Sequence, residues 1–255
     1  MTGLPTLAPI SLQGKRALVT GGSAGIGLGA AAALAGVGTH VTIIARERAP
    51  LDMAVNALSE GEQSVQGVAL DVTDTAAWVD FVTTEAPFDV LVNCAGMSRN
   101  GPALETTIED FDAVMALNVK AAYFVTQQVG KRLIETGRPG SLINISSQYG
   151  KAGDHQRAVY SASKHAVEGM TKSLAVEWGE YDIRVNTICP TVIQTRRTLP
   201  MLKDPAALKY VHDRIKLNRL GRPSDIMGAV VYLASDWSSM VTGTSLVVDG
   251  GWLAD

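Results

Sequence analysis

Short apolar runs alternate with segments of helical pattern along almost the whole chain, and this alternation constrains the fold more than any other feature. The runs are continuous, which is typical of strands buried on both faces of a parallel sheet. Strands are expected at residues 16–20, 40–44, 64–70, 90–93, 142–145, 183–188 and 245–249. Helices are expected from the turn after the first strand to about residue 36, and over 50–58, 75–83, 108–134, 158–178 and 224–234. The pattern predicts an α/β protein with a doubly wound parallel sheet and helices on both faces.

The chain shows no linker, internal repeat or low-complexity stretch, so residues 1–255 are expected to form a single domain. Residues 191–217 combine two prolines, several charges and mixed patterning, which suits a mobile helical flap over a substrate site. The long segments 108–134 and 158–178 and the apolar C-terminal strand with Trp252 could either belong to the core or join copies of the chain into a homodimer or homotetramer.

Composition excludes several classes of protein. The net charge of −3 is opposite to the basic field that nucleic acids require. No apolar run reaches the roughly eighteen residues of a membrane span, and the first residues do not resemble a secretory signal. Cys94 and Cys189 lie in apolar, strand-like contexts that favour buried free thiols. A cytoplasmic protein with no nucleic-acid or membrane partner is therefore expected, and no metal site is assigned.

A glycine-rich turn follows the first predicted strand. Gly21, Gly25 and Gly27 connect that strand to the alanine-rich helix. Glycines let the backbone turn sharply and approach a diphosphate, and the helix N-terminus offers unpaired N–H groups to it. The spacing differs from the G-x-G-x-x-G fingerprint, and an ordinary strand–helix loop explains many such turns. Its position in the first βαβ unit favours a dinucleotide site.

The end of the second predicted strand bears on which dinucleotide binds. NAD sites have an acidic residue there, on the ribose hydroxyls, whereas this chain has Arg46. A guanidinium offers a planar fork of donors to a 2′-phosphate, so NADP(H) is favoured and NAD(H) stays open. Arg46 could instead be a solvated surface side chain or engage Glu47. Asp71 could accept from the adenine amino group or cap the next helix.

Tyr160 and Lys164 are four residues apart in a predicted helix, which places a phenol and an ammonium on one face. A nearby cation favours the phenolate and lowers the pKa of the tyrosine toward a useful range. Ser147 follows the strand 142–145, and its hydroxyl could polarise a carbonyl while Tyr160 exchanges the proton. Most Tyr-x-x-x-Lys pairs are merely an ordinary tyrosine and a solvated lysine, so the interpretation depends on the rest of the chain.

Besides Ser147, Tyr160 and Lys164, the chain contains the glycine-rich turn, Asp71-Val72, Asn93-Cys-Ala-Gly96, Asn118 and Pro190. These features have the order and spacing of the short-chain dehydrogenase/reductase family, which the chain resembles over essentially its whole length. The resemblance implies a seven-stranded Rossmann sheet and a catalytic set of Asn118, Ser147, Tyr160 and Lys164. The cofactor-binding residues that it implies are Gly21, Ser23, Gly25, Ile26, Gly27, Arg46, Asp71, Val72, Asn93, Ala95, Gly96, Tyr160, Lys164, Pro190, Ile193 and Thr195. The substrate-binding residues are Ser147, Gln148, Tyr149 and Tyr160.

In this assignment Tyr160 is the acid/base, Ser147 holds the substrate oxygen, Lys164 binds the nicotinamide ribose, and Asn118 helps to hold a relay water. Asn118 falls inside a predicted helix, where asparagine is a poor helix former. It is either a kinked functional position or an ordinary amide. Two departures from the family pattern are Cys94, where asparagine is frequent, and Thr191, where glycine is usual.

Three stretches, at 138–148, 186–192 and 240–244, resemble the branch of L-xylulose reductases and tetrameric carbonyl reductases. This likeness implies hydride transfer between the nicotinamide of NADP(H) and a secondary alcohol or ketone of a sugar, polyol or small carbonyl compound. A 3-oxoacyl thioester reductase shares the same catalytic residues and is the first alternative. A regulatory protein that binds NADP(H) without turnover is the second.

The substrate pocket is expected to include polar residues of one loop, which suits hydroxylated substrates better than acyl chains. These residues are Gln148, Tyr149, Asp154, His155 and Arg157. A solvent-facing position is the simpler interpretation of His155. Arg196 and Arg197 on the flap could attract an anionic substrate or stay hydrated, and the sequence does not decide between these roles.

Overall fold

The computed structural model describes residues 6, 8–60 and 64–254. Seven strands form one sheet in the order β3-β2-β1-β4-β5-β6-β7, and every neighbouring pair is parallel. The strands are β1 (Arg16–Thr20), β2 (His40–Ala45), β3 (Val65–Ala69), β4 (Val90–Asn93), β5 (Gly140–Ile145), β6 (Ile183–Pro190) and β7 (Ser245–Val248). This topology confirms the predicted doubly wound, seven-stranded Rossmann sheet.

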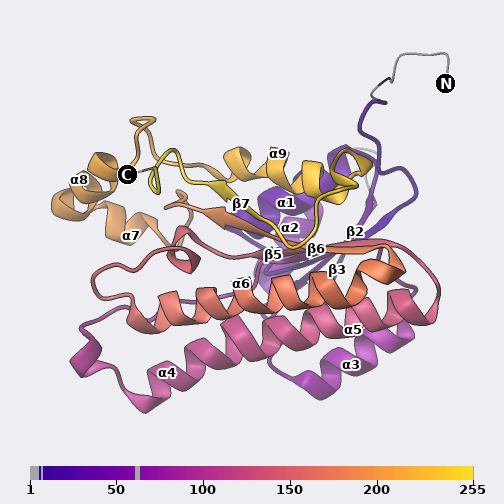
Figure 1. Cartoon of the computed structure of the whole chain (residues 1–255), viewed down its shortest axis with the longest axis horizontal. Helices are drawn as coiled ribbons and strands as arrows, with labels where there is room; N and C mark the ends of the chain where they lie inside the picture. Colours follow the sequence, from indigo (N-terminus) through magenta and orange to yellow (C-terminus); the bar gives the residue numbers. More distant parts are fainter. Residues whose placement is uncertain (1–5, 7, 61–63, 255) are drawn as a thin grey trace.

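Helices cover both faces of the sheet (Figure 1). One face carries α1 (Gly25–Gly36), α2 (Arg48–Leu58) and α9 (Pro223–Ala234). The other carries α3 (Thr75–Thr84), α4 (Ile108–Met115), α5 (Ala122–Glu135) and α6 (Ala158–Trp178). Short 3₁₀ turns lie at Ala103–Glu105, Gln148–Gly150, Gly179–Tyr181 and Asp236–Ser238.

The central strands are largely apolar because they contribute to two cores. In β1, Ala17 and Val19 belong to the cluster under α1 and α9, whereas Leu18 belongs to the cluster under α3 and α5. Successive side chains of a strand point to opposite faces, so a strand covered on both sides needs apolar residues at every position. The same constraint explains why alternating polarity is absent from the sequence.

Three expected boundaries are wrong by two residues. The fifth strand begins at Gly140, because Gly140 and Ser141 already pair with β6. The sixth strand continues beyond residue 188, because Cys189 and Pro190 still pair with β7, where Pro190 lies opposite Val248. The second helix begins at Arg48, two residues before the proline that was expected to open it, because proline is tolerated in the first turn of a helix.

The long helical segment after β4 contains a register change. Between α4 and α5 the backbone forms a π-helical segment, Ala116–Ala121, which includes Asn118. Single π-turns inside α-helices recur at functional sites. The α-helical pattern is thus interrupted at Asn118, as its low helix propensity suggested, and its functional role stays a prediction.

The segment between β6 and α9 contains two short helices, α7 (Leu199–Leu202) and α8 (Pro205–Arg214), beside the C-terminal residues (Figure 1). Asp204 caps α8 by accepting a hydrogen bond from the Ala206 N–H. Leu202, Val211 and Ile215 pack against Tyr149 and Trp252. The predicted helical flap is thus seated over the loop that follows β5. Among the described residues no helix combines the length and apolar character needed to cross a bilayer.

Candidate active site

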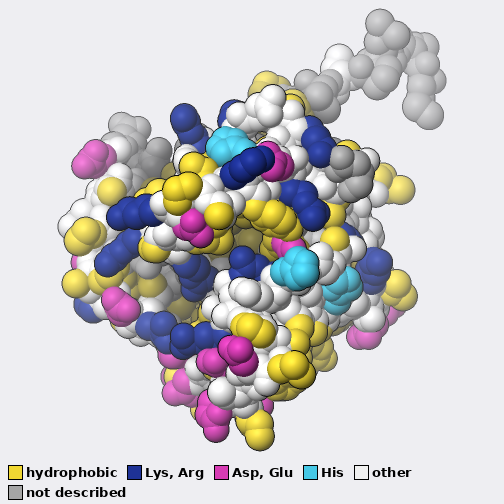
Figure 2. Space-filling model, turned by 90° about the vertical axis from the view of Figure 1, so that its left-hand side faces the viewer, with side chains coloured by type: hydrophobic (Ala, Val, Ile, Leu, Met, Phe, Trp, Pro, Cys, Tyr) yellow, Lys and Arg dark blue, Asp and Glu magenta, His cyan; other side chains and the backbone are white. Residues whose placement is uncertain are grey.

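A cleft of about 430 Å³ opens where β1 and β4 end side by side. The chain direction of the crossovers reverses between these strands, and parallel α/β sheets bind ligands at such a point. Figure 2 shows the molecule from the side on which α7 and α8 lie in Figure 1, and this face is hollowed near its centre. Residues from the glycine-rich turn, the ends of β4 and β5, α6 and the flap line the cleft.

The glycine-rich turn can form only with glycine at particular positions. Gly21 and Gly25 have φ angles of +66° and +56°, which residues with a Cβ rarely adopt. A Cβ on Gly27 would lie 2.2 Å from the Gly21 carbonyl oxygen. The turn therefore brings its own backbone to the cleft at the N-terminus of α1, as a diphosphate site requires.

Polar side chains buried behind the cleft hold the ends of β1 and β4 together. The Thr20 hydroxyl donates to Asn93 Oδ1 at 2.9 Å and accepts from the N–H groups of Cys94 and Ala95 at 3.0 and 3.1 Å. Asn93 in turn donates to the Ala122 carbonyl at 3.0 Å. These bonds fix the backbone that follows β4, opposite the glycine-rich turn.

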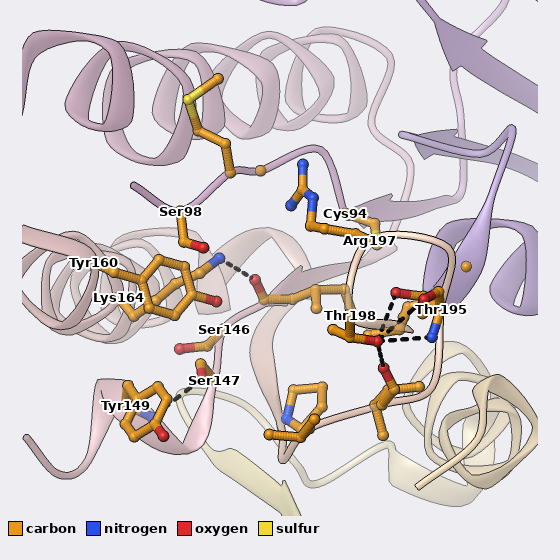
Figure 3. Close-up of a pocket in the computed structure, with 18 of the residues that line it drawn as sticks. Cys94, Ser98, Ser146, Ser147, Tyr149, Tyr160, Lys164, Thr195, Arg197 and Thr198 are labelled. Carbon is orange, nitrogen blue, oxygen red and sulfur yellow. Dashed lines mark hydrogen bonds between the residues drawn. The ribbon is translucent and has the colours of Figure 1, made fainter. Parts of the chain in front are cut away.

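Tyr160 and Lys164 both reach the cleft from α6, and Ser147 reaches it from the end of β5 (Figure 3). The Lys164 ammonium lies 5.8 Å from the centre of the Tyr160 ring and donates to the Ile145 carbonyl at 2.8 Å. The Ser147 hydroxyl accepts from the Tyr149 N–H at 3.1 Å, which leaves its own proton to donate toward a bound oxygen. The phenol, the ammonium and the hydroxyl therefore converge on one space.

Asn118 lies behind Lys164 and ties the π-helical segment to the loop after β4. Its amide accepts from the Met97 N–H and donates to the Met97 carbonyl, both at 2.8 Å. It also donates to Ser163 at 3.0 Å. A Cβ on Gly96 would lie 3.2 Å from the Asn118 oxygen, so this packing is close. Asn118 is buried and does not line the cleft.

Arg46 and Asp71 lie outside the cleft, at the ends of β2 and β3. Their nearest charged atoms are 3.9 Å apart and both side chains are largely exposed. Burial opposes ionisation of Asp71, but the hydrogen bonds from Thr73 and the charge of Arg46 outweigh it, so the pKa of this carboxyl lies below its ordinary value. The helix-cap interpretation of Asp71 is wrong, because Asp74 caps α3 through the Ala77 N–H.

Most of the predicted site residues are brought together at the cleft. Those that line it are Gly21, Gly25, Ile26, Ala95, Gly96, Ser147, Gln148, Tyr149, Tyr160, Lys164, Pro190, Ile193 and Thr195. Those outside its lining are Ser23, Gly27, Arg46, Asp71, Val72, Asn93 and Asn118. Of the polar loop residues, Arg157 lines the cleft, whereas Asp154 and His155 do not.

Several lining residues were missed from the sequence, among them Met97, Ser98, Asn100, Thr198 and Met201. Ser98 and Asn100 lie two and four residues after Gly96, so their position in the loop after β4 was a usable signal. Thr198 had none. Its hydroxyl donates to the Ile193 carbonyl at 2.6 Å and accepts from the Thr195 N–H at 2.9 Å, which shapes the start of the flap.

The two cysteines are free, but only Cys189 is fully buried; Cys94 is partly exposed and lines the cleft. Burial raises the pKa of the Cys94 thiol to about 11, against the opposing charges of Lys164 and Arg197. The thiol therefore stays protonated at neutral pH and does not act as a nucleophile.

The cleft fits a dinucleotide on its own geometry. The glycine-rich turn leaves backbone exposed beside the N-terminus of α1, and Thr195 of the flap faces Gly25, with a methyl 3.0 Å from the place of a Cβ. The Thr191 hydroxyl is buried without a hydrogen-bond partner beside the cleft. Buried polar atoms of this kind call for a bound polar group.

Comparisons with known proteins agree with this geometry. A family model described as enoyl-(acyl carrier protein) reductase matches residues 21–253. L-xylulose reductase of Bos taurus is 38% identical over 96% of this chain and 99% of its own length. The 2-dehydro-3-deoxy-D-gluconate 5-dehydrogenase of Dickeya dadantii is also 38% identical, over 97% and 99%.

A solved structure extends this likeness to three dimensions. It contains an Agrobacterium tumefaciens protein described as a 2-deoxy-D-gluconate 3-dehydrogenase, with bound NADP. Its TM-score is 0.93 and its sequence identity 40%, covering 97% of this chain and 99% of the other. The chain belongs to the short-chain dehydrogenase/reductase family and is an oxidoreductase.

One buried carboxylate, Glu168, joins three elements beneath the site. It accepts from Lys151 at 2.6 Å, from Ser245 of β7, and from the Cys189 thiol at 3.3 Å. Burial would raise the pKa of Glu168, but its hydrogen bonds, led by that of Lys151, outweigh burial and hold it below the ordinary value. The stability that Glu168 contributes is therefore present above about pH 4.5 and is lost as the pH falls through the lowered value.

We expect Glu168→Gln to lower the free energy of unfolding at pH 7 by about 1–3 kcal/mol, because the amide cannot replace a charged acceptor. The loss of stability from pH 6 to pH 3 should also become shallower than in the wild type. Urea unfolding across this pH range measures both effects. Glu177→Gln, an exposed change on the same helix, is the matched control. An unchanged pH dependence in Glu168→Gln would contradict the assignment.

Proposed function

We propose that this oxidoreductase transfers a hydride between NADP(H) and a secondary alcohol or ketone of the sugar or polyol class. The observation that carries the proposal is the convergence of Tyr160, Lys164 and Ser147 on one cleft beside the glycine-rich turn. These groups provide an acid/base, a charge to support it and a hydroxyl donor, which together suit proton transfer to a developing alkoxide.

In the reducing direction Ser147 and Tyr160 hydrogen-bond the carbonyl oxygen of the substrate. The bound cofactor supplies the hydride that forms the new C–H bond, and takes one back in the oxidising direction. As the C=O double bond becomes a single bond, the O–H bond of Tyr160 breaks and its proton passes to the oxygen. The Lys164 ammonium stabilises the phenolate that remains, because opposite charges attract strongly away from bulk water.

The remaining predicted roles follow from position. Lys164 also binds the nicotinamide ribose in this proposal, and its ammonium lies 3.7 Å from the place of a Cβ on Gly96, in the loop after β4. Asn118 fixes the loop after β4 through Met97 and lies beside Gly96 and Ser163. In this position it can hold a relay water that returns a proton to Tyr160. Pro190, Ile193 and Thr195 flank the nicotinamide end.

NADP(H) is the proposed cofactor because Arg46 stands at the end of β2, where an NAD site has a carboxylate. The side chain is exposed, and among the described residues its ion-pair partner is Asp71, at 3.9 Å. It can therefore turn to a 2′-phosphate and bind it with two parallel hydrogen bonds. The bound NADP in the related Agrobacterium structure supports the same choice.

A hydroxylated substrate is favoured by the polar lining beyond Tyr160. Gln148 is 1% exposed and neither atom of its amide has a hydrogen-bond partner, which suits a substrate hydroxyl. The names of the Bos taurus and Dickeya dadantii relatives, a ketose reductase and a sugar-acid dehydrogenase, support this class. Turnover of a ketose and of an acetoacetyl thioester, compared at equal concentration, separates this function from thioester reduction.

The regulatory alternative, a protein that binds NADP(H) without turnover, predicts a different result in this comparison of substrates. Tight NADPH binding without oxidation of the cofactor by any ketose, ketone or thioester would favour a sensor.

Exposed apolar side chains on α6 and near β7, such as Val176 at 84% and Met240 at 94%, support the proposed assembly into a homodimer or homotetramer. The cytoplasmic location stays a prediction.

We expect Tyr160→Phe to lower kcat by about 10²- to 10⁴-fold, because the variant keeps the ring but has no proton to exchange. NADPH binding, followed by its fluorescence, should stay within a few-fold of the wild type. Tyr181→Phe, which removes a hydroxyl from an exposed tyrosine after α6, is the matched control. Full activity of Tyr160→Phe would rule the mechanism out.

For the cofactor, Arg46→Gln should raise KM for NADP(H) by about tenfold or more, since a charge-assisted contact to phosphate is lost. KM for NAD(H) should stay nearly constant, because NAD has no phosphate at that position. Steady-state kinetics of Arg46→Gln and the wild type with each cofactor measures the two changes in KM, so NAD(H) is the control for NADP(H) within one variant. Equal effects on the two KM values would show that Arg46 does not read the 2′-phosphate.

A further inference from the structure

The charged side chains that line the cleft are all cationic. They are Arg157, Lys164, Arg196 and Arg197, and none of the described lining residues is acidic. Dark blue Lys and Arg side chains border the hollow in Figure 2. The whole chain has a net charge of −3, so this concentration of positive charge is local to the cleft. The residues around each cation divide them into two groups. Three lie on the side of the cleft where the cofactor is proposed to bind, and the fourth, Arg157, does not.

Three of these cations lie on the cofactor side. Lys164 is held by the Ile145 carbonyl beside Tyr160. Arg196 and Arg197 directly follow Thr195, the flap residue that faces Gly25. Arg197 also lies near Cys94, at the end of β4, where its charge acts on the pKa of the thiol (Figure 3). A dinucleotide carries phosphates along this side, and these cations can balance them.

Arg157 lies on the opposite side, at the N-terminus of α6. Its guanidinium is half-buried, 5.9 Å from the centre of the Tyr149 ring, and its Nη2 is 3.9 Å from the Met201 sulfur. Tyr149 in turn packs edge-on against Tyr160, with ring centres 6.3 Å apart. Arg157 therefore belongs to the part of the cleft beyond the reacting oxygen, where the remainder of a substrate extends.

The nearby carboxylate, Asp154, is already engaged. Its two oxygens accept from the hydroxyls of Tyr149 and Tyr210, both at 2.6 Å, and the positive charge of Arg214 acts on it. Among the described residues no carboxylate pairs with Arg157. The planar fork of the guanidinium, which matches a carboxylate, is thus available to a ligand.

Gln148 supplies a second, independent observation. It is 1% exposed, lines the same part of the cleft, and neither its amide nitrogen nor its amide oxygen has a hydrogen-bond partner. The amide nitrogen can donate to a carboxylate oxygen, and the amide oxygen can accept from a neighbouring hydroxyl. A polyhydroxy acid presents both groups, whereas a neutral polyol presents only hydroxyls.

We infer that the substrate is a hydroxy acid, and that Arg157 binds its carboxylate while Gln148 binds an adjacent oxygen. This inference rests on the proposed function and adds the charge of the substrate to it. Arg157 is then a specificity-determining residue that selects sugar acids over the corresponding alditols. A charge-assisted pair shielded from water predicts a preference of about 10- to 100-fold.

The test compares pairs of compounds that differ only in whether the terminal carbon is a carboxylate or a hydroxymethyl group. Gluconate and glucitol, xylonate and xylitol, and threonate and threitol are such pairs. Calorimetric titration into the Tyr160→Phe protein saturated with NADP⁺ measures binding without turnover. The acid of at least one pair should bind about tenfold or more tightly than its alditol.

When it is introduced into the Tyr160→Phe protein, Arg157→Gln should abolish the preference for the acid over its alditol. Arg157→Lys should retain part of that preference. Lys15→Gln, which removes one positive charge at the opposite edge of the sheet, should leave it unchanged. The dissociation constant of NADPH should be the same in all these proteins, which reports an intact cleft. The inference is overturned if no acid binds better than its alditol, or if the preference persists in Arg157→Gln.

Oxidation of the same acids and alditols by the wild-type protein with NADP⁺ distinguishes a failure of this inference from a failure of the proposed function. Oxidation of alditols as efficiently as acids would overturn the charge assignment and leave hydride transfer standing. Absence of NADP⁺-dependent oxidation of every acid and alditol, together with no reduction of ketoses by NADPH, would contradict the proposed function itself.

Discussion

The site depends on one buried positive charge. The Lys164 ammonium is 6% exposed and has the Ile145 carbonyl, at 2.8 Å, as its hydrogen-bond acceptor. Removing an ammonium from water carries a penalty of several kcal/mol unless negative or polar groups surround it. A single carbonyl compensates only part of that penalty. The arrangement is stable because folding of the sheet and α6 holds the charge there, and a phenolate or a ribose bound beside it would complete its shell.

The rest of the fold can be understood as support for that charge. The bond to Ile145 joins α6 to the end of β5, so the lysine, the tyrosine one turn earlier and Ser147 share one frame. Thr20 and Asn93 lock β1 to β4 on the other side of the cleft. The π-helical segment turns Asn118 toward Met97 and Ser163, which fixes the loop between these two halves. Each contact is a buried polar bond, and such bonds specify one geometry where apolar packing alone would tolerate several.

Much of this was predictable from the sequence, for physical reasons. Continuous apolar strands follow from burial on two faces, and the glycines of the first turn are required by positive φ angles at Gly21 and Gly25. Tyr160 and Lys164 share a face of α6 because residues four positions apart lie on the same face of any α-helix. Contacts between distant segments were not predictable. The place of Arg157, for example, depends on where Tyr149 and Met201 meet. The bonds of Thr198 are local, but they depend on the irregular path of the flap. The cap role considered for Asp71 was wrong although α3 begins at the expected residue, because Asp74, directly before that helix, accepts from the Ala77 N–H.

The account is tested most directly by removing the charge and returning it in solution. Lys164→Ala should reduce kcat by about a hundredfold or more with saturating NADPH, because the phenolate loses its support. Added propylammonium should restore part of that rate, and propanol, a neutral compound of similar size, should not. Wild-type kcat in the unrescued variant, or equal rescue by propanol, would show that the buried charge is not what makes the tyrosine an acid.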